Sequence, residues 1–355
     1  MLVGRDGIRR DWLEGLVAEI ADARKRGQQV IVVSSGSIAL GAARLGLDKG
    51  GRGSLADAQA AAAVGQIALS ALWADLLGAH GLTAAQLLLT LEDLEDRRRY
   101  LNATATLTRL LDLGAVPVIN ENDSVATQEI RFGDNDRLAA RVAQAAQASA
   151  VLLLSDVDGL FDRNPADPAA ELLPEVRGVT AEIHAMASGG SASGMGSGGM
   201  TSKLQAAEIA GRAGIALAIA SGLHDAPIAR ATAQGVGTLF LPKVVRGRKD
   251  GGRKAWLGGR LRLKGALVID AGAVRALGKG SSLLAAGVAR VEGAFQRGDA
   301  VAVRDEAGVT LAHGLAEYDA AECIRLLGHK NADHAAILGY SPRSAVVHRD
   351  QMVLL

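Results

Sequence analysis

Residues 150–160 read AVLLLSDVDGL, an apolar run that ends abruptly in Ser155 and Asp156. A short, continuous apolar run bounded by polar residues is typical of a strand that is buried on both faces. Runs of the same kind occur at residues 28–37 (QQVIVVSSGS), 84–90 (AAQLLLT), 115–123 (AVPVINEND) and 215–222 (IALAIASG). Strands buried in this way belong to parallel sheets with helices on both faces, so these runs predict an α/β fold.

The segments between the predicted strands have the apolar spacing of helices. Helices are predicted within residues 8–27, in two stretches within 54–79, and within 95–114, 137–148 and 202–214. Several of them close on a glycine, which is a common helix stop signal. The alternation of strand and helix continues to about residue 240, and a mainly parallel sheet is expected there.

Length and composition limit the class of protein. A chain of 355 residues is long enough for two domains, and 49% of it is apolar. The formal net charge of +1 gives no overall attraction to nucleic acid or membrane. The single cysteine, Cys323, excludes an internal disulfide framework. With no uncharged apolar stretch of about 20 residues and no secretory signal, a cytoplasmic protein without a membrane span is predicted.

Polar residues follow four of the predicted strands at the point where each strand ends. They are Ser34–Ser37, Asn120–Asp123, Ser155–Asp156 and Ser221–Gly222. Any one of these groups could be ordinary turn or cap chemistry. The carboxyl ends of parallel strands meet at one edge, where ligands bind in such sheets. Four groups at one edge therefore favour a binding site.

The glycine-rich stretch SGMGSGGMTSK, residues 193–203, allows two interpretations. One is a flexible linker. The other is a cradle of backbone amides for phosphate at the start of a helix. The stretch matches G-x-G-x-x-G but follows no predicted strand, and Met200 stands where a Walker A lysine would be. Thr201 or Ser202 is predicted to cap the helix. Lys203 in its first turn opposes the helix dipole, which suggests an anionic ligand.

A second cluster of polar residues lies at 134–136. Asp134 and Asp136 flank Asn135 directly before a predicted helix. Helix capping needs only one of these side chains, so the second acid suggests a charge that orients a lysine or a metal-linked role. Asn120, Asn122 and Asp123 are suited to binding an ammonium group. A turn-forming role for Asp123 is the alternative.

Five stretches together resemble the amino acid kinase family, and within it the members that phosphorylate glutamate. They are VIVVSSGSIALG (30–41), PVINENDSVAT (117–127), FGDNDRLAA (132–140), LLLSDVDGLF (152–161) and SGMGSGGMTSKLQAAEIAGRAGI (193–215). The resemblance runs in the family's order across residues 2–240. It implies a three-layer α/β/α domain over residues 1–242, which transfers phosphate from ATP with Mg²⁺ to the side-chain carboxylate of L-glutamate. The product would be L-glutamyl 5-phosphate, in the first step of proline biosynthesis.

The resemblance also implies roles for individual residues. Ser35, Asp123 and Asn135 would contact glutamate, and Ser155 and Asp156 would lie near the nucleotide. Lys203 would be catalytic, and Asp136 would orient catalytic lysines. The phosphates of ATP would be wrapped by Ser197, Gly198, Gly199, Met200, Thr201, Ser202 and Lys203. No protein ligand of the metal is implied, because ATP can hold Mg²⁺ itself.

The chain departs from the family pattern at its first residues. Family members begin with a strand that ends in lysine and glycine, and this lysine stabilises the transferring phosphate. Met1-Leu2-Val3-Gly4 resembles the stretch that follows that strand. We therefore expect the sheet to lack a central strand and the chain as given to be weakly active or inactive and poorly stable. The family also implies a homo-oligomer and inhibition by proline.

Beyond residue 242 the composition changes. Residues 243–262 are rich in arginine, lysine and glycine and are interpreted as a linker. Residues 263–355 resemble a PUA domain, a small β-rich module. Within it, VEGAFQRGDAVAV (291–303) predicts two strands around a tight turn, and residues 336–355 predict the closing strands. His313, His329, His334 and His348 match no zinc spacing.

Two alternatives to glutamate phosphorylation stay open. The first is another member of the family, such as an aspartate or acetylglutamate kinase. The second is RNA binding through the PUA-like domain, with a kinase domain inactivated by the departure at its start. Only 3% of the residues are aromatic and available to stack on bases. A structural or regulatory role for the PUA-like domain is therefore favoured.

Overall fold

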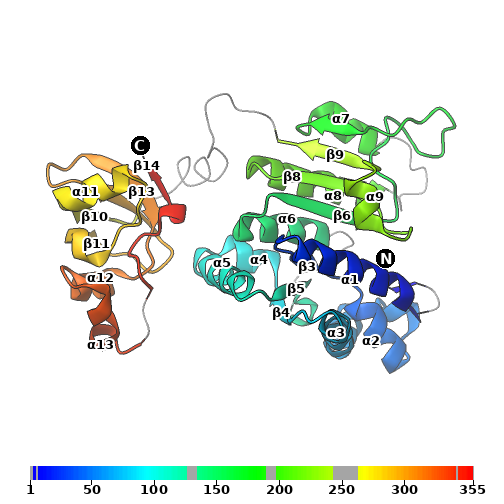
Figure 1. Cartoon of the computed structure of the whole chain (residues 1–355), viewed down its shortest axis with the longest axis horizontal. Coiled ribbons are helices and arrows are strands. Elements are labelled where there is room, and N and C mark those ends of the chain that lie inside the picture. Colours follow the sequence, from blue (N-terminus) through cyan, green and yellow to red (C-terminus); the bar gives the residue numbers. More distant parts are fainter. Residues whose placement is uncertain are drawn as a thin grey trace. The chain divides into compact units, whose positions relative to one another are not determined.

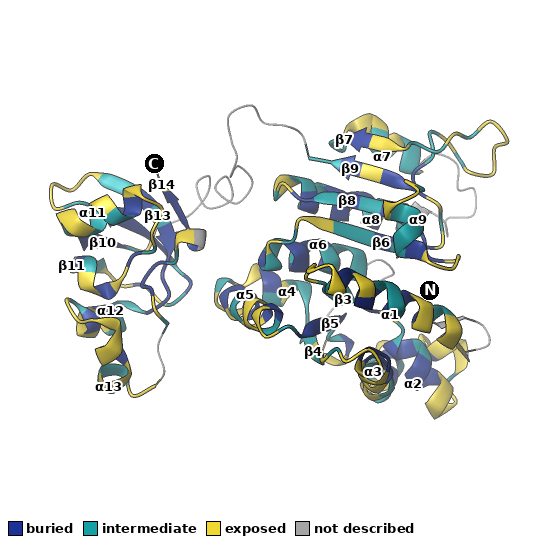
Figure 2. Cartoon of the chain, viewed as in Figure 1, coloured by how far each residue is buried: buried dark blue, intermediate teal, exposed yellow. Residues whose placement is uncertain are grey.

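The chain divides into two compact units, Met1–Val245 and Arg246–Leu355. The computed structural model describes residues 3–4, 7–125, 134–188, 197–242, 263–340 and 343–354. The interpreted linker at 243–262 lies outside these residues, as do the first glycines of the 193–203 stretch. Figure 1 shows the helices and strands of each unit. Many of the buried residues lie on them, and others, such as Leu160 and Phe295, lie in the loops between them (Figure 2).

The first unit alternates strands and helices, as predicted. Its strands are β1 (Val3–Gly4), β2 (Gly7–Ile8), β3 (Val32–Val33), β4 (Ala84–Leu89), β5 (Val116–Glu121), β6 (Ala150–Ser155), β7 (Glu175–Arg177), β8 (Ala216–Ser221) and β9 (Thr238–Leu241). Its helices are α1 (Arg10–Lys25), α2 (Ser37–Leu45), α3 (Leu55–Gly78), α4 (Leu91–Glu95), α5 (Arg97–Asp112), α6 (Asp134–Ala146), α7 (Ala181–Ser188), α8 (Ser197–Arg212) and α9 (Pro227–Thr232). The prediction missed the short strands β1, β2, β7 and β9 and the helices α2, α4, α7 and α9.

The strands of the first unit form two larger sheets and a small β1–β2 hairpin. One sheet has the order β3-β5-β4, and its pairings are parallel. The other has the order β6-β8-β9-β7, in which only β8 and β9 pair antiparallel. The predicted mainly parallel arrangement is confirmed. Within the described part of the chain, no strand pairing joins β3 to β6.

Strand β5 shows why helices cover both faces of its sheet. Val116 and Val118 pack into a cluster with residues of α1 and α3. Ile119 points the other way and packs into a cluster with residues of α5 and α6. Because neighbouring side chains of a strand point to opposite faces, this alternation places helices on the two sides of β5. The three-layer α/β/α fold is therefore confirmed (Figure 1).

Helix α3 corrects the prediction of two helical stretches within residues 54–79, because it is a single helix of 24 residues. Gly65, in its middle, is a site of close approach to α2. A Cβ at Gly65 would lie 1.8 Å from the Ser37 carbonyl oxygen, and one at Gly41 would lie 1.8 Å from the Ala61 carbonyl oxygen. The two glycines let the backbones of α2 and α3 meet.

Helix α3 is also long and apolar enough, by length and composition alone, to cross a membrane. Such helices also occur as core helices of soluble proteins. Leu69, Trp73 and Leu77 of α3 are buried in the cluster shared with α1 and β5. The packing is that of a core helix.

The second unit contains one mixed sheet in the order β11-β10-β12-β13-β14. Its strands are β10 (Gly265–Ile269), β11 (Val288–Gly293), β12 (Ala300–Arg304), β13 (Thr310–Leu315) and β14 (Met352–Leu354), and its helices are α11 (Ala271–Gly278), α12 (Ala320–Leu326) and α13 (His334–Leu338). The β-rich character is confirmed, and β14 is a closing strand. However, β11 and β12 do not form the expected hairpin, because β10 lies between them and pairs with both.

Candidate functional site

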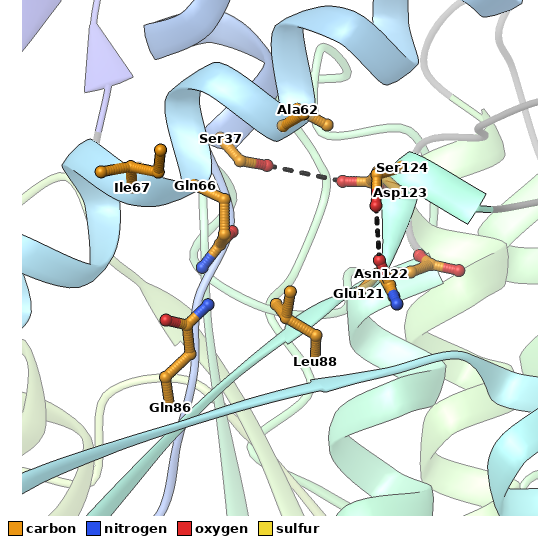
Figure 3. A pocket seen from close by; sticks show the side chains of 11 residues that line it. Ser37, Ala62, Gln66, Ile67, Gln86, Leu88, Glu121, Asn122, Asp123 and Ser124 are labelled. Atoms are coloured by element: carbon orange, nitrogen blue, oxygen red, sulfur yellow. Dashed lines mark hydrogen bonds between the residues drawn. The ribbon is translucent and has the colours of Figure 1, made fainter.

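A pocket of about 320 Å³ opens in the first unit at the carboxyl ends of β4 and β5. It is lined by Ser37, Ala62, Ala63, Gln66, Ile67, Gln86, Leu88, Glu121, Asn122, Asp123 and Ser124. Figure 3 shows Ser37 directed at Asp123, and Gln66 and Gln86 directed toward each other. The pocket therefore lies at the strand edge where the sequence predicts binding.

A chain of hydrogen bonds connects the walls of this pocket. The Asn120 side-chain amide donates to Ser37 Oγ at 3.2 Å and to Gln66 Oε1 at 2.8 Å. Ser37 Oγ donates to Asp123 Oδ2 at 3.4 Å. Asn135 Nδ2, from the first turn of α6, donates to Asn120 Oδ1 at 3.3 Å. Asn120 is 2% exposed and stands at the centre of this network.

Local backbone geometry places these side chains. Gly36 has a φ of 112°, and this left-handed conformation turns the chain from β3 into α2. The turn directs Ser37 inward, where it is 2% exposed. Asn120 is the second-to-last residue of β5. It therefore lies at the edge of the sheet where the carboxyl ends of the parallel strands meet. A buried amide needs hydrogen-bond partners, which explains the polar network in this place.

The pocket is suited to an amino-acid ligand. Asp123 and Glu121 contribute two acidic side chains to its lining, which favours a cationic group such as an ammonium. Among the described residues, Asn135 Oδ1 is a buried oxygen without a hydrogen-bond partner. A buried acceptor of this kind is costly unless a ligand or water satisfies it.

A second polar contact joins α6 to α8. Lys203 Nζ donates to Asp136 Oδ2 at 3.0 Å, and Ser202 Oγ donates to the same oxygen at 3.1 Å. The Lys203 and Asp136 side chains are 13% and 19% exposed. Both side chains are thus mostly buried between α6 and α8. The carboxylate of Asp136 neutralises the positive charge of Lys203.

The start of α8 corrects the predicted cap. The helix begins at Ser197, so neither Thr201 nor Ser202 is its N-cap and Lys203 lies in the second turn. Ser202 Oγ, whose single hydrogen is shared with Asp136, also lies 2.9 Å from the Gly199 carbonyl oxygen. Gly198 and Gly199 have low helix propensity, which is why the sequence predicts a loop there. Met200, at their side, packs against the core of α8 and β8, and such tertiary contacts can override propensity.

The ends of β6 and β8 form a third polar group. Ser155 and Ser221 are paired in the parallel register and both are buried. Ser155 Oγ donates to Asp156 Oδ1 at 3.1 Å. The Gly222 amide donates to the Ser155 carbonyl at 2.7 Å. Asp156 itself is exposed at this edge.

The structure brings together several of the residues predicted from the sequence. Asp123 joins Asn135 through Ser37 and Asn120, and Asp136 contacts Lys203. Ser35 is exposed, and it is Ser37, two residues later, that bonds to Asp123. Of Ser197 and Gly198 only the backbone, and of Asp134 only its place in α6, lies within the described part of the chain.

Sequence reasoning missed the parts of the network that come from α3 and from the middle of β4. Gln66 and Gln86 carry no motif, and Ser70 of α3 links them, donating to Gln86 Oε1 at 2.7 Å and accepting from Gln66 Nε2 at 3.2 Å. One signal was present. Gln66 follows Gly65, a glycine inside an otherwise helical pattern, which often has a packing reason.

Comparison with known proteins identifies the family. The model of the amino acid kinase family matches residues 2–221, and that of the PUA domain matches residues 265–338. The glutamate 5-kinase of Novosphingobium aromaticivorans is 70% identical, over 100% of this chain and 93% of that protein. Those of Sphingopyxis alaskensis and Zymomonas mobilis are 62% and 54% identical, over 98% and 100% of this chain and 93% and 89% of those proteins. The chain thus belongs to the amino acid kinase family and, within it, to the glutamate 5-kinases.

Proposed function

We propose that the protein transfers the γ-phosphoryl group of ATP to the side-chain carboxylate of L-glutamate. One observation carries this proposal. The consecutive residues Asn135 and Asp136, at the start of α6, bond to the pocket network and to Lys203 respectively. An acceptor in the pocket would therefore lie close to the lysine that follows the glycine-rich stretch.

The chemistry is an in-line displacement at phosphorus. A side-chain carboxylate oxygen of glutamate forms the new bond to the γ-phosphorus, the bond to the β–γ bridging oxygen breaks, and ADP leaves. A glutamate carboxylate has a pKa of about 4.3, so it is ionised at neutral pH and needs no general base. The protein's task is to align two anions and to stabilise the charge that spreads over the phosphoryl oxygens.

Lys203 is proposed to stabilise that charge, and Asp136 to hold its ammonium group in place. The backbone amides at the start of α8 add positive potential. Ser155 and Asp156, at the end of β6, are proposed to border the nucleotide. Asp123 and Asn135 are proposed to bind glutamate, with Ser35 at the rim of the same strand edge.

Mg²⁺ is proposed to enter with ATP. Among the described residues, no group of three or more histidine, cysteine, aspartate or glutamate side chains could hold a metal ion. Mg²⁺ usually keeps several water ligands and is bound by one or two protein carboxylates together with the phosphates of the substrate, so it does not need such a group. Asp156 is the exposed carboxylate at the nucleotide edge that could contribute one. When bound, Mg²⁺ supplies neutralisation of phosphate charge.

The pocket lining favours free glutamate over related acceptors. An acetylated amine carries no positive charge and would lose the attraction of Asp123 and Glu121. Aspartate is one methylene shorter, a difference for which enzymes discriminate by roughly 10–200-fold. We place the enzyme in the cytoplasm, in proline biosynthesis. Self-association and inhibition by proline belong to the same proposal and are tested by sedimentation and by proline titration.

The test is an assay of ADP release with L-glutamate, L-aspartate and N-acetyl-L-glutamate as acceptors, combined with hydroxylamine trapping of the acyl phosphate. We expect turnover and hydroxamate formation with glutamate alone. Asp123→Asn should raise the KM for glutamate and leave the KM for ATP nearly unchanged. Equal turnover with N-acetyl-L-glutamate would rule out the proposed ammonium recognition.

A further inference from the structure

The N-terminal end of α1 holds a segment that is more than 200 residues away in the sequence. Arg9 Nη1 donates to the Gly222 carbonyl at 3.2 Å, and Arg9 Nη2 donates to the Leu223 carbonyl at 3.0 Å. Trp12 Nε1 donates to the His224 carbonyl at 3.0 Å. Three consecutive carbonyl groups are thus bound by two side chains. We refer to Arg9 and Trp12 together as the clasp.

The two side chains of the clasp also support each other. The Arg9 guanidinium lies 5.0 Å from the centre of the Trp12 ring, within the range of a cation–π contact. Hydrogen bonds from a charged donor are stronger than neutral ones. A fork of guanidinium donors can serve two carbonyls at once, whereas a lysine is a single point of charge. The two carbonyls therefore require the two donors of an arginine, and the third carbonyl requires an indole N–H.

Farther along α1, a second contact holds the other end of the same segment. The Glu19 carboxylate accepts hydrogen bonds from the backbone amides of Ile228 at 3.1 Å and Ala229 at 2.7 Å. These amides belong to the first turn of α9. Helix α1 therefore holds residues 222–229 at both ends.

The clasped segment borders the proposed nucleotide edge. It begins directly after Ser221, which is paired with Ser155 in the parallel register. The Gly222 amide donates to the Ser155 carbonyl, so the segment is in contact with the end of β6. Leu223 is 51% exposed, and residues 224–226 are exposed as well, whereas Gly222 and Pro227 at the two sides are buried. The segment is thus accessible at the edge where ligands bind in parallel sheets.

Helix α1 itself belongs to the half of the unit that carries the acceptor pocket. Leu13, Val17 and Ile20 pack with α3 and with β5, the elements that supply Gln66 and Asn120. In the described part of the chain no strand pairing joins β3 to β6. Side-chain packing must therefore fix the two sheets relative to each other, and Leu154 of β6 and Ile228 of α9 pack against the cluster that contains α1.

We propose that Arg9 and Trp12 are positioning residues that hold the Gly222–His224 segment against the end of β6 and so place the nucleotide relative to the acceptor pocket. The inference rests on the proposed function, because it takes the end of β6 as the nucleotide edge. Displacements of about 1 Å in the alignment of reacting groups can cost on the order of 100-fold in rate. Loss of the clasp should therefore raise the KM for ATP more than the KM for glutamate.

The test compares Arg9→Ala and Trp12→Phe with Arg10→Ala as the matched control. Arg10 follows Arg9 as the first residue of α1 and forms an exposed pair with Glu14 at 3.0 Å. We expect Arg9→Ala and Trp12→Phe to raise the KM for ATP about 10-fold and to leave the KM for glutamate within about twofold. Arg9→Lys should recover part of the loss. Arg10→Ala should match the parent protein.

Direct nucleotide binding separates this inference from the proposed acceptor. Hydrogen exchange of the parent protein should show that a non-hydrolysable ATP analogue protects a peptide covering residues 221–229. The same peptide should exchange faster in Arg9→Ala and Trp12→Phe but not in Arg10→Ala. Protection of the parent peptide by the analogue supports the clasp even if glutamate is not the acceptor.

Three results would overturn the inference. The first is an unchanged KM for ATP in both variants. The second is an equal rise of both KM values together with a lower Tm, which would mark a purely structural role. The third is absence of protection of residues 221–229 by the analogue in a parent protein that binds it.

Discussion

Lys203 is the residue on which the proposed phosphoryl transfer depends most directly. Its ammonium group is held by Asp136 at 3.0 Å and is only 13% exposed. A lysine placed in this way can meet developing negative charge without searching through many side-chain conformations. When no anion is bound, the Asp136 carboxylate neutralises the ammonium group of Lys203. This explains why a cation is tolerated in the N-terminal half of α8, where the helix dipole opposes it.

We predict that Lys203→Ala lowers kcat by on the order of 10²–10³, the typical loss when one donor to a developing oxyanion is removed. Asp136→Asn should lower kcat less, because the ammonium group of Lys203 remains but loses the ion pair that fixes its position. Steady-state kinetics with both substrates measure the effect. Lys25→Ala is the control, because Lys25 forms an exposed pair with Asp22 in α1. Parent-like kcat in Lys203→Ala would refute the catalytic role.

Cys323 is a buried residue whose environment makes it unreactive. It is 2% exposed, and burial raises the pKa of its thiol from 9.0 to about 12. The thiolate is the reactive form, so the folded protein should resist alkylation at neutral pH. Between pH 9 and 12 the unfolded chain loses this proton while the folded chain keeps it. The free energy of unfolding should therefore fall as pH rises through that range.

We predict that iodoacetamide at pH 8 labels Cys323 slowly in the native protein and rapidly in urea. Mass spectrometry of the intact protein gives the labelled fraction. A Leu326→Ala variant, which opens the core beside Cys323, serves as the comparison and should label faster. Native labelling at the rate of a free thiol would show that the thiol is not buried.

At the scale of elements, the contact between α2 and α3 is decided by two glycines. Gly41 and Gly65 let the helix backbones meet, and this approach brings Ser37 of α2 and Gln66 of α3 into one network around Asn120. The acceptor pocket therefore depends on a packing detail of two helices. Close packing of this kind transmits small changes, because interiors have few voids.

We predict that Gly65→Ala destabilises the first unit by about 3 kcal/mol, the upper end of the usual cost of overpacking. The added Cβ would lie 1.8 Å from the Ser37 carbonyl oxygen, so one helix must move. The KM for glutamate should rise as well. Gly15→Ala in α1 is the matched control, since a Cβ there meets nothing within 4 Å. It should stabilise by up to about 1 kcal/mol, measured by urea unfolding. A neutral Gly65→Ala would contradict the close approach.

At the scale of the whole molecule, the two compact units have separate cores. The cluster of the second unit contains Leu267, Val303 and Cys323, and no residue of the first unit belongs to it. The first unit has its own clusters around β5, β6 and α3. Separate cores predict separate unfolding, because each unit loses its own buried apolar surface.

We predict that Leu267→Ala, at a fully buried position of β10, destabilises the second unit by about 2–5 kcal/mol. The first unit should keep its unfolding transition and the KM for ATP. Differential scanning calorimetry, with hydrogen exchange to assign each transition, makes the comparison. One common transition that shifts as a whole would show that the units unfold together.

Much of the fold could be predicted because its signals are local. The apolar runs at β4, β5, β6 and β8 and the helical spacing of α1, α5 and α6 are periodicities of neighbouring residues. The short strands β7 and β9 gave no such signal. The hairpin expected at residues 291–303 was wrong, because proximity in sequence suggested a pairing that β10 takes instead. Strand partners are long-range choices that local pattern does not contain.

The sequence alone determined the α/β class, the strand edge that carries the polar residues and the family to which the chain belongs. Only the tertiary structure decided that Ser37 bonds to Asp123, that α8 begins at Ser197, and that Arg9 holds residues after β8. The physical reason is the range of the forces involved. Periodicity and propensity act over a few residues, whereas a hydrogen bond across more than 200 residues exists only after the helices and sheets have packed.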